Sequence, residues 1–309
     1  MRVWLTGGNG MLGRSIQRVA EESPQLDIVA PGRAACDLLD AEHTLQWAAQ
    51  NGPFDAVICA AAQVGGIQAN VAAPWDFLQT NLRIDASTFQ AATAVGVQRL
   101  MYVGSSCMYP RDQETPLRET DLLAAPLEPT NEGYAIAKIA GTRACAYRSQ
   151  QFGETWRAIV PCNLYGPGDH YSPGRSHLLA AIVHKIATAV RTGETEVEIW
   201  GDGEARREFL YVDDLARFML AALNRLKELP HHLNVGYGTD HTVNEYYRMV
   251  ADVFGWQGRF EHDLSRPVGM RRKLMDSTLA RSLGWAPQTD FVRGITLARD
   301  AYLQQERAR

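Results

Sequence analysis

Two features are missing from this chain of 309 residues, and each absence excludes a class of partner. No apolar run reaches the roughly 18–20 residues that a membrane-spanning helix needs, so we expect no membrane partner. A basic excess is also missing, because 31 lysines and arginines stand against 35 aspartates and glutamates, with a formal net charge of −4. Proteins that bind nucleic acid through their general surface carry such an excess, so we expect no nucleic-acid partner.

Paired cysteines are also absent. The five cysteines are scattered and form no C-x-x-C pair; they are Cys36, Cys59, Cys107, Cys145 and Cys162. This pattern disfavours a disulfide framework or a zinc knuckle, and no histidine has the spacing of a metal ligand. A strand-like run follows Met1 directly, so we expect no signal peptide. These features together predict a cytoplasmic protein that uses no metal.

The chain does contain a regular alternation of apolar, β-branched runs with helix-like patterns. Between the runs lie amphipathic segments, such as the one that carries Leu12, Ile16, Val19 and Ala20. The runs are residues 3–5, 26–30, 56–60, 100–104 and 157–160. Continuous apolar strands separated by helices indicate a parallel sheet covered on both faces, and right-handed crossovers make it doubly wound. We therefore predict an α/β fold with a Rossmann-type domain.

A chain of this length has room for two lobes, and its character changes after about residue 163. A loop rich in Gly, Pro and Ser spans residues 163–176, and a helical pattern follows at 178–190. We assign residues 1–162 to the dinucleotide-binding domain and residues 163–309 to a smaller, mostly helical substrate domain. The stretch near 207–236 contains two further strand-like runs, which we expect to return to the first domain.

A glycine-rich turn follows the first strand. Gly7, Gly10 and Gly13 form the pattern G-x-x-G-x-x-G between a strand and a helix. Such a turn lets the backbone approach a pyrophosphate, which then lies at the helix N-terminus. The position in the chain favours a dinucleotide site over a plain glycine turn. The predicted contacts are Gly7, Gly8, Asn9, Gly10, Met11, Leu12 and Gly13.

The end of the second strand indicates which cofactor is bound. A carboxylate there would bind the ribose 2′-hydroxyl of NAD. This chain has no acid until Asp37 but has Arg33, which is placed to pair with a 2′-phosphate, so we predict NADP. The alternative is that Arg33 is a solvated surface charge. Further along the cofactor we expect Leu38 near the adenine and the small residues Ala60, Ala61 and Ala62.

A tyrosine and a lysine suggest the chemistry. Tyr134 and Lys138 are four residues apart and share one face of a helix. A neighbouring ammonium lowers the pKa of a phenol, so we expect Tyr134 to exchange a proton near neutral pH. Ser105 follows the fourth strand, at the edge where ligands bind such sheets. A lone Tyr-x-x-x-Lys is usually structural, but these residues behind a dinucleotide turn indicate hydride transfer between a carbonyl and an alcohol.

Two further residues can move protons beside a ketone. Cys107 lies two residues after Ser105, and His177 opens the helical pattern after the flexible loop. A thiol and an imidazole on opposite sides of a keto-sugar can remove and return a proton next to the carbonyl, which acidifies that hydrogen. The alternatives are a small buried apolar residue for Cys107 and a polar helix-terminal residue for His177.

Four stretches carry a family resemblance. They are residues 60–67, Gly-Ser-Ser-Cys-Met-Tyr-Pro at 104–110, residues 128–141 beginning Glu-Pro-Thr-Asn-Glu, and residues 163–167. They resemble the GDP-L-fucose synthase group of the extended short-chain dehydrogenase/reductase family, which are NADPH-dependent GDP-4-keto-6-deoxy-D-mannose 3,5-epimerase/4-reductases. The likeness extends to about Asp276. It implies a nucleotide-sugar substrate and a homodimer, for which the helix of Tyr134, with Ala137, Ala140 and Ala144, is a candidate surface.

The resemblance implies roles for individual residues. Ser105, Tyr134 and Lys138 take the reductase roles, and Cys107 and His177 the epimerase acid/base roles. Implied NADP contacts are Val103, Gly104, Ser105, Ser106, Tyr134, Lys138, Pro161, Cys162, Asn163, Leu164 and His177. Implied substrate contacts are Ser105, Cys107, Tyr134, Asn163, Lys185, Trp200, Arg207 and Lys273.

Five positions depart from the family pattern. The family usually has arginine at Lys185, aspartate at Val268 and lysine at Gln63, and Met270 and Arg271 depart from it as well. A lysine still meets a phosphate, but without the fork of a guanidinium. The changes leave the chemistry intact and the exact substrate open. Alternatives are a 4-reductase or single-site epimerase/reductase for a heptose or colitose precursor, an NAD-retaining nucleotide-sugar epimerase, and a catalytically inactive NADP-sensing protein.

Overall fold

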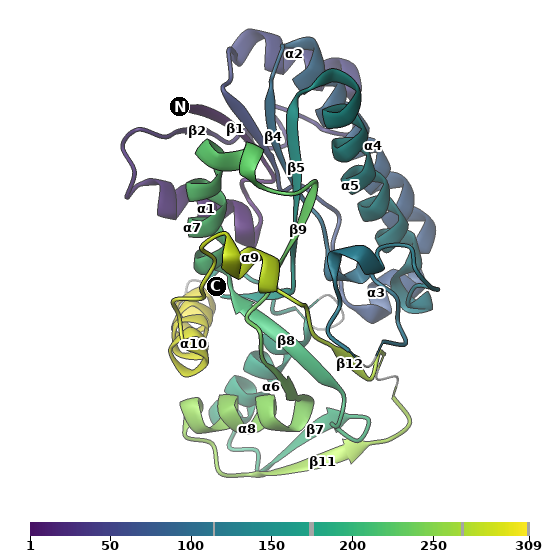
Figure 1. Cartoon of the computed structure of the whole chain (residues 1–309). Helices are drawn as coiled ribbons and strands as arrows, with labels where there is room; N and C mark the ends of the chain where they lie inside the picture. Colours follow the sequence, from purple (N-terminus) through teal and green to yellow (C-terminus); the bar gives the residue numbers. More distant parts are fainter. Residues whose placement is uncertain (114, 173–175, 267–268, 308–309) are drawn as a thin grey trace.

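The computed structural model describes residues 1–113, 115–172, 176–266 and 269–307. A larger part is built on a six-stranded sheet and a smaller part lies below it, and the chain passes between them several times (Figure 1).

The larger sheet is parallel throughout and has the order β2-β1-β3-β4-β5-β9. Its strands are β1 (Arg2–Thr6), β2 (Asp27–Val29), β3 (Ala56–Cys59), β4 (Arg99–Val103), β5 (Thr155–Pro161) and β9 (His232–Val235). The predicted doubly wound α/β fold is confirmed, because strand order reverses beside β1 and the connections are helical.

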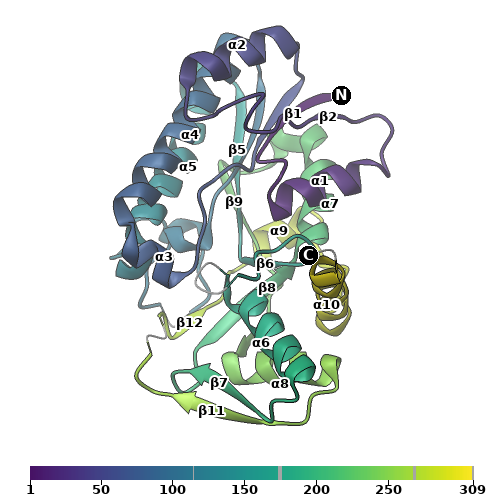
Figure 2. The same ribbon diagram turned by 180° about the vertical axis from the view of Figure 1, so that it is seen from behind.

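Helices cover both faces of this sheet, as the two opposite views show (Figures 1 and 2). On one side lie α1 (Met11–Ala20) and α7 (Val212–Ala222); on the other lie α2 (Ala41–Asn51), α4 (Pro74–Ala94) and α5 (Glu132–Phe152). Successive side chains of β1 explain the two layers. Val3 and Leu5 pack in the core with α1 and α7, whereas Trp4 packs in a separate core with α2 and α4.

The first helix forms as its apolar spacing predicts, with Leu12, Ile16, Val19 and Ala20 buried. It is joined to α7 by polar contacts as well, because Ser15 and Arg18 both donate hydrogen bonds to the carboxylate of Asp213. This packing couples the glycine turn to a segment about 200 residues away in sequence.

The smaller part contains strands as well as helices. One sheet has the order β10-β8-β12, with β6 also paired to β8, and a second sheet joins β7 to β11. The strands are β6 (Asn163–Tyr165), β7 (Glu196–Trp200), β8 (Arg206–Tyr211), β10 (Asp240–Thr242), β11 (Arg259–Asp263) and β12 (Arg272–Lys273). The helices are α6 (Leu178–Thr192), α8 (Val243–Phe254) and α10 (Phe291–Arg307).

The stretch at 207–236 divides between the two parts. β9 pairs with β5 and α7 packs on α1, whereas β8 lies in the second sheet. The expected loop at 163–176 begins instead with β6, because these residues pair with β8. Short helices complete the chain: α3 (Ile67–Ala72), α9 (Thr278–Ser282), and 3-10 turns η1 (Ser106–Met108), η2 (Glu119–Asp121), η3 (Pro129–Asn131) and η4 (Leu223–Glu228).

The outer surface of α4 and α5 is partly apolar. Trp75, Leu82, Ile136 and Tyr147 are exposed there. Ala137, which we expected on a contact surface, is instead fully buried within the chain, because it faces inward on α5. Within the described ranges, none of the helices combines the length and apolarity needed to cross a bilayer.

Candidate active site

The glycine turn is shaped for close backbone approach. Gly7 has a φ of +74°, and a Cβ at Gly13 would lie 2.1 Å from the Gly7 carbonyl oxygen. Gly10 precedes α1 in an extended conformation, and no side chain in the described part of the chain caps the helix. The first helical N–H groups therefore point outward without a side-chain acceptor, as at dinucleotide pyrophosphate sites. The turn fits the predicted cofactor.

The loop after β2 lies beside this turn. A Cβ at Gly32 would be 3.7 Å from the Asn9 amide nitrogen, which places Arg33 close to the glycine turn. The Arg33 side chain is 75% exposed and lies 3.5 Å from Asp37. Its guanidinium is thus accessible to an anion, with Asp37 as its described ion-pair partner.

The remaining predicted cofactor residues follow the same edge of the sheet. A Cβ at Gly7 would be 2.6 Å from the nitrogen of Ala61, so the alanines that follow β3 pack directly on the turn. The carbonyl of Leu38 accepts a hydrogen bond of 2.8 Å from Ser87 on α4. Val103 ends β4, and Pro161 ends β5 two residues before β6 begins at Asn163. The carboxyl ends of the parallel strands therefore bring these segments together.

Ser105 lies between the two candidate proton-transfer groups. It follows β4 and caps η1, where its hydroxyl accepts a hydrogen bond of 3.2 Å from the Cys107 backbone N–H. The same hydroxyl hydrogen-bonds the phenol of Tyr134, which lies in the first turn of α5. The structure thus assembles Ser105, Cys107 and Tyr134 in one place.

The acidity of Tyr134 differs from our expectation. Burial raises the pKa of this phenol well above its ordinary value, and the nearby Cys107 adds to the rise, which the Ser105 hydrogen bond only partly offsets. The Lys138 ammonium donates its described hydrogen bond, of 2.9 Å, to the Val103 carbonyl. The prediction of a lowered pKa is wrong: Tyr134 is a protonated donor at neutral pH.

Cys107 has the opposite tendency. The amide of Asn131 and the ammonium of Lys273 each donate a hydrogen bond of 3.2 Å to its sulfur. Burial acts to raise the pKa of this thiol, but the Lys273 charge and the hydrogen bonds from Ser105, Lys273 and Asn131 outweigh it and lower the pKa. The other cysteines behave differently, because burial raises the pKa of Cys36, Cys59, Cys145 and Cys162.

His177 is exposed and lies immediately before α6. The protein around its ring, together with the charges of Lys273 and His170, lowers its pKa. Its imidazole is therefore neutral at neutral pH. The same Lys273 ammonium acts on His177 and on Cys107, so these two groups from separate parts of the chain share one electrostatic environment.

Cationic residues of the smaller part line the approach to Cys107. Lys273 on β12 is the register partner of Arg207 on β8, so both positions lie at the same level of this sheet. Burial lowers the pKa of Arg207, while Glu128 and Cys107 favour its charge. Asn163 is anchored nearby through a 3.0 Å hydrogen bond from its amide to the Glu208 carbonyl.

A second cluster surrounds Trp200 at the end of β7. The Lys185 ammonium lies 5.6 Å and the Arg266 guanidinium carbon 5.1 Å from the centre of the indole ring. The indole N–H donates a hydrogen bond of 2.7 Å to Glu198, and Lys185 donates one of 2.7 Å to the carbonyl of the same residue. Val268, one of the departures from the family pattern, lies outside the described residues.

The sequence matches the NAD dependent epimerase/dehydratase family over residues 3–236. The chain belongs to this family. It is 41% identical over 307 residues to a GDP-L-colitose synthase of Yersinia pseudotuberculosis, with 99% of each chain covered. It is 43% identical over 302 residues to a GDP-L-fucose synthase of Azorhizobium caulinodans, covering 98% of this chain and 96% of the relative.

A solved structure supports the same relationship. The GDP-mannoheptose C4 reductase from Campylobacter jejuni, solved with NADP bound, superposes with a TM-score of 0.88 at 28% identity. The match covers 98% of both chains. The chain is therefore an enzyme of the epimerase/dehydratase family.

Sequence reasoning missed three residues of this family member's site. Asn131 contacts the Cys107 sulfur, and its only signal was its place in the Glu-Pro-Thr-Asn-Glu stretch. Asp85 and Tyr102 lie beside Lys138, and no sequence pattern marked either one. Such residues come from different elements, so spacing along the chain does not reveal them.

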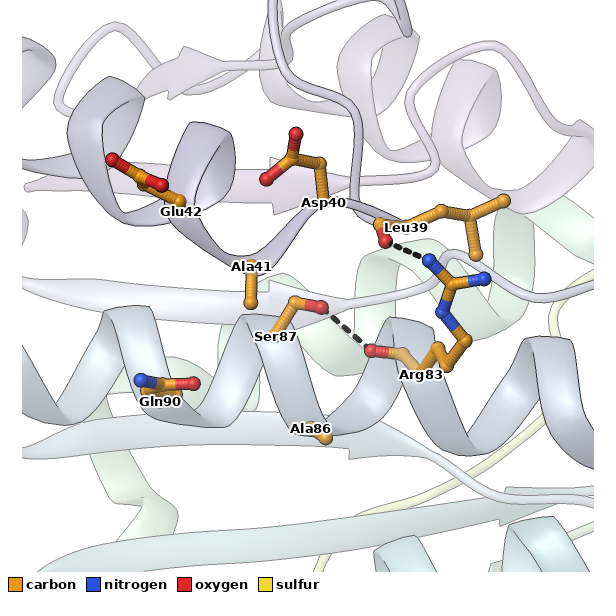
Figure 3. A pocket seen from close by; sticks show the side chains of 8 residues that line it. All are labelled: Leu39, Asp40, Ala41, Glu42, Arg83, Ala86, Ser87 and Gln90. Atoms are coloured by element: carbon orange, nitrogen blue, oxygen red, sulfur yellow. Dashed lines mark hydrogen bonds between the residues drawn. The ribbon is translucent and has the colours of Figure 1, made fainter.

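A separate hollow lies between the start of α2 and the side of α4 that faces it (Figure 3). Arg83 crosses it and donates a hydrogen bond to the Leu39 carbonyl, while Ser87 donates one of 2.7 Å to the carbonyl of Arg83. It is lined by Leu39, Asp40, Ala41, Glu42, Arg83, Ala86, Ser87 and Gln90. None of the candidate catalytic residues is among these.

Proposed function

We propose that this enzyme is an NADPH-dependent GDP-4-keto-6-deoxy-D-mannose 3,5-epimerase/4-reductase, a GDP-L-fucose synthase. The observation that carries the proposal is one site that holds both the Ser105–Tyr134 pair and a Cys107 thiol contacted by Lys273. The first pair suits reduction of a carbonyl, and the second suits removal of a proton beside it. The relative from Azorhizobium supports the same activity.

NADPH supplies the hydride for carbon 4 of the sugar when it is bound. The glycine turn of residues 7–13 would hold its pyrophosphate, and Arg33 its 2′-phosphate. Lys138 of α5, whose ammonium bonds the Val103 carbonyl at the end of β4, would contact the ribose of the nicotinamide. The NADP-bound structure of the Campylobacter reductase supports this choice of cofactor.

Epimerisation begins with proton removal. The ketone at carbon 4 acidifies the hydrogens at carbons 3 and 5. Cys107 takes such a proton as a thiolate, since Lys273 and Asn131 stabilise the anionic sulfur. His177 would return a proton on the other face of the sugar: its neutral imidazole first takes a proton from solvent, and the imidazolium then passes it to the carbon, while the Cys107 thiol releases the proton that it removed to solvent.

The charge that develops on the carbonyl oxygen is stabilised by two hydroxyl groups. Ser105 and Tyr134 donate hydrogen bonds to the enolate oxygen, a role that requires donors already in place. The raised pKa of Tyr134 is useful here, because a phenol that keeps its proton is a donor at neutral pH. In the reduction, Tyr134 then gives this proton to the oxygen at carbon 4.

The nucleotide portion would lie along the smaller part. Arg207 can hold the diphosphate through charge-assisted hydrogen bonds, and Lys273 adds a second cation at the same level. Trp200, with Lys185 beside it, offers a flat surface and a positive charge to the nucleoside.

GDP-L-colitose synthesis is the second candidate, because a relative of that name is 41% identical over almost the whole chain. The two reactions differ at carbon 3, which carries no hydroxyl in a colitose precursor. We expect deuterium uptake at carbons 3 and 5 for the fucose reaction and at one site for the single-epimerisation alternative.

The test measures NADPH oxidation in heavy water against GDP-, UDP- and dTDP-linked 4-keto-6-deoxy sugars, with product stereochemistry resolved by NMR. We expect GDP-4-keto-6-deoxy-D-mannose to yield GDP-L-fucose labelled at carbons 3 and 5. Cys107→Ser and His177→Asn should each reduce the labelling by about 10²-fold or more. Undiminished labelling in both variants would contradict the epimerase roles.

We also propose a homodimer formed through α4 and α5, in a reducing cytoplasm. The exposed side chains of Trp75, Leu82, Ile136 and Tyr147 support this surface. Light scattering of the purified chain tests it, with Trp75→Glu and Tyr147→Glu together expected to give monomers. The five free thiols are compatible with a reducing compartment.

A further inference from the structure

Behind the catalytic lysine lies a buried polar cluster to which the proposed reaction assigns no role. The Lys138 side chain is almost completely buried, and its ammonium lies 4.6 Å from the centre of the Tyr102 ring. The Tyr102 hydroxyl donates a hydrogen bond of 2.7 Å to the carboxylate of Asp85. Lys138 comes from α5, Tyr102 from β4 and Asp85 from α4, so three elements meet at this point.

The backbone leaves space for this cluster at one position. A Cβ at Gly141 of α5 would lie 2.4 Å from the Tyr102 hydroxyl oxygen and 2.8 Å from an oxygen of Asp85. Any larger residue would push α5 away from α4 or displace the carboxylate. The close crossing of the two helices is therefore built around the Asp85–Tyr102 hydrogen bond.

A buried ammonium needs a counter-charge, and the groups that face Lys138 identify it. They are Asp85 on α4, Cys59 on β3 and Cys145 on α5, with the Tyr102 ring on β4. Burial raises the pKa of both thiols well above the ordinary value, so both are neutral at neutral pH. Among the described groups that act on Lys138, Asp85 is thus the carboxylate that can supply the negative charge.

The two charges depend on each other. Burial lowers the pKa of Lys138, and Asp85 opposes that change. Burial likewise raises the pKa of Asp85, while Lys138 and the Tyr102 hydroxyl oppose it. Each charge therefore favours the other through electrostatic attraction. The Tyr102 hydrogen bond favours the charged arrangement, because it stabilises the carboxylate.

We propose that Asp85 and Tyr102 are positioning residues that keep Lys138 charged and directed at the end of β4, where the cofactor ribose would lie. Tyr102 supports the ammonium with its ring face and orients Asp85 with its hydroxyl. The inference rests on the proposed NADPH-dependent function, in which Lys138 contacts that ribose.

The test is a fluorescence titration of the full chain with NADPH between pH 6 and 10, which needs no sugar substrate. Asp85→Asn removes the charge, so we expect the alkaline loss of NADPH affinity to begin about 1–3 pH units lower than in the wild type. Tyr102→Phe keeps the ring and the carboxylate but removes the hydrogen bond that orients Asp85. We expect affinity about 3- to 10-fold weaker at every pH, with the alkaline limb unmoved.

Asp213→Asn is the matched control, because it removes another buried carboxylate that accepts hydrogen bonds, at the contact of α1 with α7. We expect Asp213→Asn to lower the melting temperature but not to change the alkaline pH at which NADPH affinity falls. If the NADPH affinity of Asp85→Asn falls at the same alkaline pH as that of the wild type, the inference is overturned. If Asp85→Asn does not fold, Tyr102→Phe decides, and unchanged affinity overturns it. A wild type that binds no NADPH at any pH refutes the proposed function and the inference with it.

Discussion

Lys273 is the residue whose removal tests the proposed proton transfer most directly. Its ammonium lies 3.2 Å from the Cys107 sulfur and is the main cation that lowers the thiol pKa. An opposite charge at such a distance shifts a pKa by about 1–3 units. In Lys273→Met the Cys107 pKa should therefore rise by about that amount, because burial then acts with less opposition.

The expected rate follows from the thiolate fraction. Each unit by which the pKa exceeds the working pH reduces that fraction about tenfold, so a rise of about 1–3 units should lower proton exchange at pH 7 by up to about 10³-fold. Exchange should recover as the pH rises, since a raised pKa moves the active thiolate to more alkaline solution. The loss of a cation that only bound phosphate would instead raise KM equally at all pH values.

The assay follows exchange of the hydrogens at carbons 3 and 5 with deuterium by NMR, separately from NADPH oxidation, between pH 6 and 10. Lys185→Met is the control, because this lysine lies near Trp200 and has no contact with Cys107 among those described. It should weaken substrate binding and leave the pH profile of exchange unchanged. An exchange rate and pH profile in Lys273→Met that match the wild type would refute the assigned role of Lys273.

Three further predictions concern other parts of the molecule. Tyr134→Phe should lower the rate of sugar reduction by about 10²-fold or more while NADPH binding, measured by fluorescence, stays within twofold of the wild type. Arg33→Ala should weaken NADPH binding about tenfold and leave NADH binding unchanged, since only NADPH carries the 2′-phosphate; equal losses for both would contradict its role. Glu208 is buried and accepts hydrogen bonds from the backbone of Gly238 and Met275, and burial raises its pKa from 4.5 to about 7. Because this pKa is higher in the folded chain than in the unfolded chain, the folded chain binds the proton more tightly. The free energy of unfolding should therefore fall by about 3 kcal/mol as the pH rises from about 4.5 through 7. Denaturant unfolding at pH 5 and pH 8 should show a smaller difference for Glu208→Gln than for the wild type.

Local patterns predicted the fold well. The apolar runs mark five of the six strands of the larger sheet, and β9 corresponds to the run expected to return to it. These features depend on near neighbours in sequence, since a buried strand needs continuous apolar residues and a glycine turn needs its spacing. Short elements were less predictable. β6 forms because it pairs with β8, and the sequence of Asn163–Tyr165 by itself does not indicate that pairing.

The sequence by itself determined which side chains carry the candidate chemistry. Ser105, Tyr134 and Lys138 could be placed together, because helical spacing and the end of a strand are local properties. The tertiary structure decided their charge states. Tyr134 keeps its proton because it is buried near Cys107, and Cys107 tends to lose its own because Lys273, 166 residues away, lies against it. The effect of Asp85 on the charge of Lys138 was likewise decided by the tertiary structure. A pKa depends on burial and on nearby charges, and only the folded chain brings these charges close together.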